Sequence, residues 1–160
     1  MFIHGSPASR VLRSRDGADI CFTVTLVDGF VLARSAFHHS MNYRSVVALG
    51  HAQFISDLEE KNQALRVITN HIVPGRWEET RSTTEKELKS TSVLALDLNE
   101  VSAKVRTGGP IDDEEDYALP IWAGVVPLRN VPSAPIPDER IVPGLPPFDL
   151  GRLSRFSRES

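Results

Sequence analysis

Residues 19–33 read DICFTVTLVDGFVLA, and they carry the clearest secondary-structure pattern in the chain. From Asp19 to Val27, apolar and polar residues alternate, which is typical of a half-buried strand. Asp28-Gly29 suits the positive φ angles of a tight turn, and residues 30–33 form a second apolar run. The pattern therefore predicts a β-hairpin over residues 19–33.

The segments on either side of this hairpin predict two further strands and a short helix. Residues 46–55 indicate a third strand, with a bulge or a close backbone approach at Gly50. Residues 2–4 look like the end of another strand. The Ser6-Pro7 pair that follows is a helix-start signal, so a short helix is predicted over residues 7–15.

Helices and one more strand are expected in the second half of the chain. Asp57 and Glu60 form a plausible capping box for a helix through residue 70. A second box, Ser82 with Glu85, predicts a shorter helix to Lys89. Residues 93–106 then predict one long strand, with three leucines on a shared face: Leu94, Leu96 and Leu98.

Composition limits the class of protein. The chain has 160 residues, of which 41% are hydrophobic, and this fits one domain with a modest core. Several strands joined by short turns, with few helices, predict a mainly β fold in the form of a small barrel. The formal net charge of −3 argues against a nucleic-acid partner. No apolar run is long enough for a membrane span, and the lone Cys21 favours the reducing cytoplasm.

The C-terminal part has a different character. Seven of the eleven prolines lie between residues 127 and 147. We therefore expect a barrel domain over residues 1–126 and an extended, weakly packed tail over residues 127–160. The acidic run at residues 112–116 is expected to be exposed to solvent.

Two polar segments are candidates for anion binding. In HGSPASR, residues 4–10, the predicted helix start combines with Ser6, Ser9 and Arg10 to favour a phosphate, although an ordinary capped helix would look the same. The second segment, residues 42–45, opens a strand, so its side chains alternate between two faces. A solvated loop and strand entrance is the alternative interpretation of this segment.

The remaining chemistry-bearing residues give weaker signals. His38 and His39 are adjacent, and the other histidines have no recognised ligand spacing, so no metal site is predicted. Lys104 and Arg106 share a strand face, where they either add positive charge to a phosphate pocket or solvate an exposed sheet. The solvated face is the favoured interpretation.

Several segments in a fixed order resemble a known family. They are residues 4–10, 27–46, 74–77, 102–106 and 122–125. With them the chain resembles the pyridoxamine 5'-phosphate oxidase-like family that has the FMN-binding split β-barrel. The similar branch contains flavin-nucleotide-binding proteins and is related to nitroimidazole-resistance proteins. The resemblance extends over roughly residues 1–128.

The resemblance implies a homodimer that binds FMN near the subunit interface. It implies that Ser6, Ser9 and Arg10 hold the phosphate and that Asn42, Tyr43, Arg44 and Ser45 border the flavin or its ribityl chain. His4 and Ser40 complete the implied set of cofactor-binding residues. The implied activity is that of a flavin-dependent oxidoreductase of unknown substrate, with NAD(P)H as a candidate electron donor and no residue named as catalytic. A non-catalytic module that binds flavin or haem, and an inactive remnant, are the alternatives.

The chain differs from the family pattern at its N-terminal side. Members of the branch usually have additional N-terminal sequence, including the first barrel strands, before the strand that ends in His-Gly-Ser. We therefore expect a barrel that is incomplete at its N-terminal side and that holds FMN more weakly than an extended form.

Overall fold

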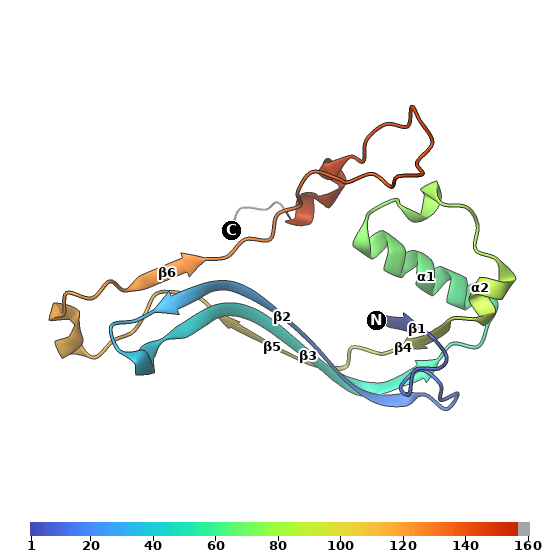
Figure 1. Ribbon diagram of the computed structural model, residues 1–160. Coiled ribbons are helices and arrows are strands. Elements are labelled where there is room, and N and C mark those ends of the chain that lie inside the picture. Colours follow the sequence, from blue (N-terminus) through green and yellow to red (C-terminus); the bar gives the residue numbers. More distant parts are fainter. Residues whose placement is uncertain (157–160) are drawn as a thin grey trace.

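The computed structural model describes residues 1–156, which form a curved antiparallel sheet with two α-helices at one end (Figure 1). The strand order is β1-β4-β3-β2-β6, and β5 pairs with another stretch of β3. The strands are β1 (Phe2–Gly5), β2 (Ala18–Leu32), β3 (Ser40–Phe54), β4 (Ser92–Ala95), β5 (Glu100–Arg106) and β6 (Gly124–Pro127). The helices are α1 (Leu58–Ile72) and α2 (Glu85–Lys89), with 3-10 segments at Ala36–His38, Trp77–Glu79, Glu114–Ala118 and Leu150–Phe156. The prediction of a mainly β fold with few helices is confirmed.

The predicted hairpin at residues 19–33 is wrong, because β2 runs through Asp28-Gly29 as one strand. The pairing with β3 shifts register between Val27 and Gly29, so the dipeptide forms a bulge instead of a turn. Two neighbours hold this stretch extended, since Gly29 pairs with Asn42 of β3 on one side and with Pro127 of β6 on the other. The true hairpin joins β2 to β3.

The strand predicted at residues 46–55 is confirmed and is longer than expected, because β3 begins at Ser40. Along one edge, β3 pairs with β5 over residues 43–49 and then with β4 at residues 53–54. Gly50 lies between these two regions and keeps regular register with Ile20, so there is no bulge. The close approach is confirmed: a Cβ atom at Gly50 would lie 3.0 Å from a methyl group of Leu96.

The helix predicted over residues 7–15 does not form. The segment is a series of tight turns, with hydrogen bonds from the Ser9 amide to the Ser6 carbonyl and from the Arg13 amide to the Ser9 carbonyl. Leu12 is buried in the core with 6% of its surface exposed. Burial of this one side chain holds the loop in place without a helix.

Both of the later helices were predicted, one with the wrong cap. The Asp57 carboxylate accepts a hydrogen bond of 2.8 Å from the Glu60 amide at the start of α1, as expected. The capping box of α2 is formed by Thr84 and Glu87, two residues later than the predicted pair. Lys61 links the helices, because its buried Nζ donates to the Leu88 carbonyl at 3.1 Å.

The long strand predicted at residues 93–106 is two strands, β4 and β5, separated by an irregular stretch. The break changes the environment of the three leucines. Leu94 and Leu96 are 0% and 1% exposed, whereas Leu98 is 56% exposed. The prediction of a shared leucine face holds only for the first two residues.

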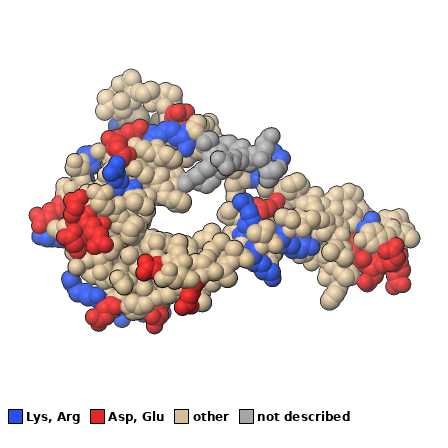
Figure 2. Space-filling view, turned by 180° about the vertical axis from the view of Figure 1, so that it is seen from behind, with Lys and Arg blue, Asp and Glu red and all other residues tan. Residues whose placement is uncertain are grey.

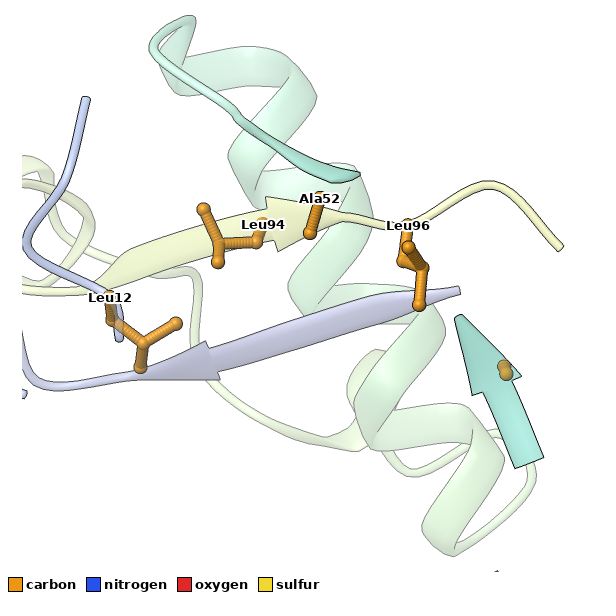
Figure 3. Packing of buried hydrophobic residues seen from close by; sticks show 5 residues of the cluster. Leu12, Ala52, Leu94 and Leu96 are labelled. Carbon is orange, nitrogen blue, oxygen red and sulfur yellow. The ribbon is translucent and has the colours of Figure 1, made fainter. Parts of the chain in front are cut away.

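The hydrophobic core lies at the helical end of the sheet (Figure 3). Its buried residues come from the N-terminal loop and from strands β3 and β4 and the residue after β4: Leu12, Ala48, Ala52, Leu94 and Leu96. A second cluster of Ile55, Ala64 and Val93 lies under α1. The rest of the sheet extends away from this core as a long projection, which we call the arm (residues 24–47 and 101–127).

The tail after β6 is largely irregular up to the 3-10 segment at Leu150–Phe156. Arg152 attaches it to the helical end, donating to both carboxylate oxygens of Glu79 at 2.7 and 2.8 Å and to the Pro74 carbonyl at 3.0 Å. The division into a domain over residues 1–126 and a tail over residues 127–160 stays a prediction. Residues 157–160 of this tail lie outside the described part.

His51 makes the stability of the loop before β2 depend on pH. Its Nδ1 lies 2.9 Å from Asp19 Oδ1 and its Nε2 lies 2.9 Å from the Asp16 carbonyl. The hydrogen bond to Asp19 and then the one to Asp16 raise the pKa of His51, because both are best satisfied by the imidazolium. This contribution is fully present below the unfolded pKa of about 6.5 and is lost as pH rises through the raised folded pKa.

We therefore expect the His51→Gln variant to lose the part of the melting-temperature decline that the wild type shows above about pH 6.5. Thermal unfolding followed across this pH range measures the difference. The matched control is His71→Gln, because His71 is exposed at the end of α1. A His51 variant whose pH profile coincides with that of the wild type would contradict the assignment.

Candidate functional site

The first predicted group, His4, Ser6, Ser9 and Arg10, lies at the helical end of the molecule. His4 is in β1 opposite Val93 of β4, and its side chain is exposed. The other three lie in the turns that lead to β2, where the Ser6 hydroxyl accepts a hydrogen bond of 3.2 Å from the Ala8 amide. The loop carries hydroxyl and guanidinium donors within five residues, but it forms no helix whose dipole could contribute.

This loop is rich in cations. Arg10, Arg13 and Arg15 lie within six residues, with Asp16 as the only nearby carboxylate in the loop sequence. Arg15 packs its guanidinium over the ring of Phe54, 5.6 Å from the centroid. Arg10 is exposed, and among residues 1–156 no carboxylate is paired with it. An exposed arginine without a carboxylate partner, beside serine hydroxyls, is suited to binding an anion.

The second predicted group, from Ser40 to Ser45, lies in the arm at the beginning of β3. Because side chains alternate along a strand, Asn42 and Arg44 point to one face while Tyr43 and Ser45 point to the other. One flat ligand therefore contacts only one of these pairs directly.

Arg44 is already paired within the chain. Its Nε and Nη2 donate to the two carboxylate oxygens of Asp28 at 2.9 and 2.7 Å. These hydrogen bonds lower the pKa of Asp28 and raise that of Arg44. Asp28 is therefore the partner of Arg44, which the sequence analysis did not predict because it placed Asp28 in a turn. The ion pair connects the bulge in β2 to β3.

The opposite face of the arm collects polar and basic groups that come from three strands. The register places Tyr43 opposite Arg106 and Ser45 opposite Lys104 on β5. The Ser45 hydroxyl also lies 2.8 Å from the hydroxyl of Thr25 on β2. Basic side chains gather on the arm, between the body of the molecule and its acidic tip (Figure 2).

Near the end of the arm, Asn42 ties two strand ends together. It donates to the Gly108 carbonyl at 3.0 Å and accepts from Arg106 Nη1 at 2.8 Å. These contacts make Asn42 part of the scaffold that shapes this end of the sheet.

The acidic run at residues 112–116 differs from the prediction at its first residue. Asp112 is buried, and it accepts hydrogen bonds of 2.9 Å from both the backbone amide and the guanidinium of Arg34. Burial alone would raise the pKa of Asp112, but these hydrogen bonds outweigh it and hold the pKa below its usual value. Arg34 also stacks on Tyr117, 4.9 Å from the ring centroid. A pairing across 78 residues leaves no local signal in the sequence.

The two predicted groups are not together within one chain. The loop with Arg10 leads into β2 where Ala18 pairs with Ala52, whereas Asn42 lies ten positions earlier in β3. At about 3.3 Å per residue, this is roughly 33 Å along the strand. A single ligand that contacted both groups of one chain would have to span this distance.

Two features are absent from residues 1–156, a cluster of metal ligands and a membrane-spanning helix. In residues 1–156, no group of three or more His, Cys, Asp or Glu side chains is arranged to hold a metal ion. None of the helices in this range has the length and hydrophobicity needed to cross a bilayer.

Comparison with known proteins identifies relatives of this fold. The model of the family described as pyridoxamine 5'-phosphate oxidase matches residues 1–105. The structure of the flavocytochrome Anf3 from Azotobacter vinelandii is 45% identical, with a TM-score of 0.86 over 97% of this chain and 72% of that one. A FAD and haem binding protein from Mycobacterium smegmatis is 39% identical, with a TM-score of 0.86 over 94% of this chain and 75% of that one.

A third structure is more distant. A protein named for 5-nitroimidazole antibiotic resistance, from Bacteroides thetaiotaomicron, is 24% identical with a TM-score of 0.48, over 64% of this chain and 58% of that one. A comparison with proteins of curated function finds no match. The expected split-barrel fold and the family resemblance are both confirmed.

Proposed function

This chain belongs to the pyridoxamine 5'-phosphate oxidase family, and we propose that it binds a flavin nucleotide and uses it for electron transfer. FMN is typical of the family, and FAD is named for one of the similar structures. The two share the isoalloxazine ring, the ribityl chain and the first phosphate. The residues of this chain are proposed to contact this common part.

The observation that carries the proposal is the loop at residues 6–15. It offers hydroxyl donors at Ser6 and Ser9 and an Arg10 guanidinium that is exposed. We assign the phosphate to these three residues and His4, because charge-assisted hydrogen bonds from arginine are among the strongest that a phosphate accepts. The segment from Ser40 to Ser45 is assigned to the ribityl chain and the ring.

The wide separation of these two groups supports a homodimer. In a two-fold dimer, each partner contributes the same surface, so the arm of one copy can lie beside the loop of the other. Such a dimer would form two equal sites, each with the phosphate loop of one copy and the Ser40–Ser45 segment of its partner.

The arm has the surface that such a dimer needs. Five large apolar residues share one of its faces, which we call the open face, and each is between 41% and 63% exposed: Val24, Leu26, Val46, Val101 and Val105. They continue the row of Ile20 and Phe22, which packs on the core. Arg44 lies between Leu26 and Val105 on this face, paired with Asp28, so the exposed apolar residues surround one ion pair. Exposed apolar residues grouped in this way mark a surface for association.

The bound flavin would supply hydride and single-electron chemistry, while the protein positions it and excludes water. We expect purified chain to take up FMN or FAD, and NAD(P)H to bleach the absorbance of the bound flavin under anaerobic conditions. Absorption spectroscopy with each nucleotide measures uptake and reduction separately. Uptake without bleaching by NADH or NADPH would identify a binding module or a different electron donor, and no uptake of either flavin would contradict the proposal.

Haem is the second cofactor that we propose. The flavocytochrome and the FAD and haem binding protein are both similar to this chain, each with a TM-score of 0.86. A flavin and a haem in one protein form a pair that can pass electrons one at a time. This favours an electron-transfer protein over a storage module.

A further inference from the structure

Strand β5 leaves one of its two backbone edges without a partner. Its inner edge pairs with β3, and among residues 1–156 no other strand pairs with it. Outside that ladder, residues 100–106 form no backbone hydrogen bond with another described residue. The residues from Glu100 to Val105 are all exposed. Free amides and carbonyls along an exposed edge are a template for pairing with another strand.

The usual devices that protect a sheet edge are missing from β5. Residues 100–106 read EVSAKVR, without proline, and they keep regular register with β3, without a bulge. Lys104 lies opposite Ser45 and therefore points to the polar face of the arm. It places no charge among the apolar residues of the open face. The edge is therefore suited to accept an added strand.

The sequence of β5 is complementary to its own reverse. When two copies of β5 run antiparallel with Ala103 opposite Ala103, all seven residues of the strand are paired. The pairs on either side of the centre are Glu100 with Arg106, Val101 with Val105, and Ser102 with Lys104. Opposite charges face each other on the polar face, and valines face each other on the open face, each pair occurring twice.

Other registers fit less well. A two-fold axis perpendicular to the sheet keeps the open faces of both copies on one side, so a residue must lie opposite its own copy. Centring the pair on Lys104 would place two ammonium groups opposite each other. Centring it on Ser102 would pair only residues 100–104. The register centred on Ala103 is therefore favoured.

The side chains needed for this contact are available. Within residues 1–156, Glu100 forms no ion pair and no side-chain hydrogen bond. Arg106 donates to Asn42 through Nη1 at 2.8 Å, which leaves its other N–H groups for a carboxylate. Val101 and Val105 are 45% and 63% exposed. Pairing would supply the carboxylate with a cation and cover part of both valines.

We propose that two copies of this chain associate through β5, which joins their sheets in the order β3-β5-β5-β3 with Ala103 on the two-fold axis. The inference rests on the proposed homodimer and states where its two copies meet. Tyr43 pairs with Arg106, whereas Glu100 pairs with Leu49 nearer the helical end. The antiparallel contact therefore brings the Ser40–Ser45 segment of one copy towards the helical end of the other, the direction in which the proposed shared site extends.

Disulfide cross-linking tests the register. In a chain with Cys21→Ser, we expect Ala103→Cys to form an inter-chain disulfide on mild oxidation, because directly opposite residues lie within disulfide range. Val101→Cys and Val105→Cys should not cross-link alone, since the two copies of either residue would lie four positions apart. The two variants should cross-link when they are mixed. Non-reducing electrophoresis and mass spectrometry detect the linked chains.

A change of charge tests the same contact without cysteine chemistry. Glu100→Arg places an arginine opposite Arg106 twice in each dimer, so we expect the dissociation constant of the dimer to rise by at least about threefold. Sedimentation over a range of protein concentrations measures it. The matched control is Glu139→Arg, the same change at an exposed residue of the tail, which should leave the dissociation constant unchanged.

Three outcomes would overturn the inference. The first is a dimeric chain in which Ala103→Cys gives no disulfide. The second is cross-linking of Val101→Cys alone, or none in the mixture with Val105→Cys. The third is a chain that sediments as a monomer at all concentrations. Flavin uptake by the same preparations separates these outcomes from a failure of the flavin proposal, because a chain that takes up flavin without the β5 contact contradicts only the contact.

Discussion

Replacing Leu94 by alanine is expected to lower the free energy of unfolding by about 3 kcal/mol, within the 2–5 kcal/mol typical of buried leucines. Leu94 has no exposed surface and lies in the cluster with Leu12, Ala52 and Leu96. Strands on both sides of β4 hold this cluster, so the neighbours cannot move in to fill the space. The cost therefore combines lost burial with an unfilled cavity. Urea unfolding monitored by tryptophan fluorescence or circular dichroism measures it.

Leu98→Ala is the matched control, because the same side chain is deleted four residues away at a position that is 56% exposed. We expect its effect to stay within about 0.5 kcal/mol. Equal losses in the two variants would mean that the break between β4 and β5 is wrongly placed and that the three leucines share one environment after all.

Arg10→Ala is expected to raise the dissociation constant of the flavin nucleotide by roughly 10- to 100-fold, the range for a lost hydrogen bond between charged groups. Arg10 is exposed, and the core near it is held by Leu12, so the variant should fold. Fluorescence titration with FMN and with FAD measures the change. Arg13→Ala, in the same loop, is the control for the general loss of positive charge.

Mixing two defective variants tests whether each site is shared between two copies. Arg10→Ala removes the phosphate contact, and Tyr43→Ala removes a ring contact at the far end of β3. Co-expressed with each other, the two variants should form mixed dimers in which one of the two sites is intact, so tight flavin binding returns in part. If every site lay within a single chain, the mixture would bind no better than the separate variants.

Helix α1 could be predicted from local sequence signals. The Asp57 carboxylate accepts a hydrogen bond from the Glu60 amide at its start, and the helix ends shortly before Pro74-Gly75. The alternation of apolar and polar residues likewise predicted the first part of β2, and the strand pattern predicted β3 from residue 46. The helix predicted over residues 7–15 does not form, although its capping signal is present. There the burial of Leu12 in the core, which the local signal does not include, determines the conformation.

The two polar segments of the candidate site were proposed from their residue types and stay predictions. The structure adds side-chain partners that the sequence did not indicate. Arg44 binds Asp28 across 16 residues, and Arg34 binds Asp112 across 78. Neither spacing follows a local rule, so the sequence suggested a turn at one aspartate and an exposed acidic run at the other.

Sequence patterns alone therefore predicted the mainly β class and the positions of α1 and α2, because alternation and capping act between residues a few positions apart. The path of β2 through Asp28-Gly29 needed the folded chain. There Gly29 is hydrogen-bonded into ladders with β3 and β6, and β6 begins more than 90 residues later in the chain. The free energy of those two ladders outweighs the local preference of the dipeptide for a turn. The same long-range pairing places Arg10 near one end of β3 and Asn42 near the other, so the separation of the two polar segments is decided by the tertiary structure and cannot be read from their spacing in the sequence.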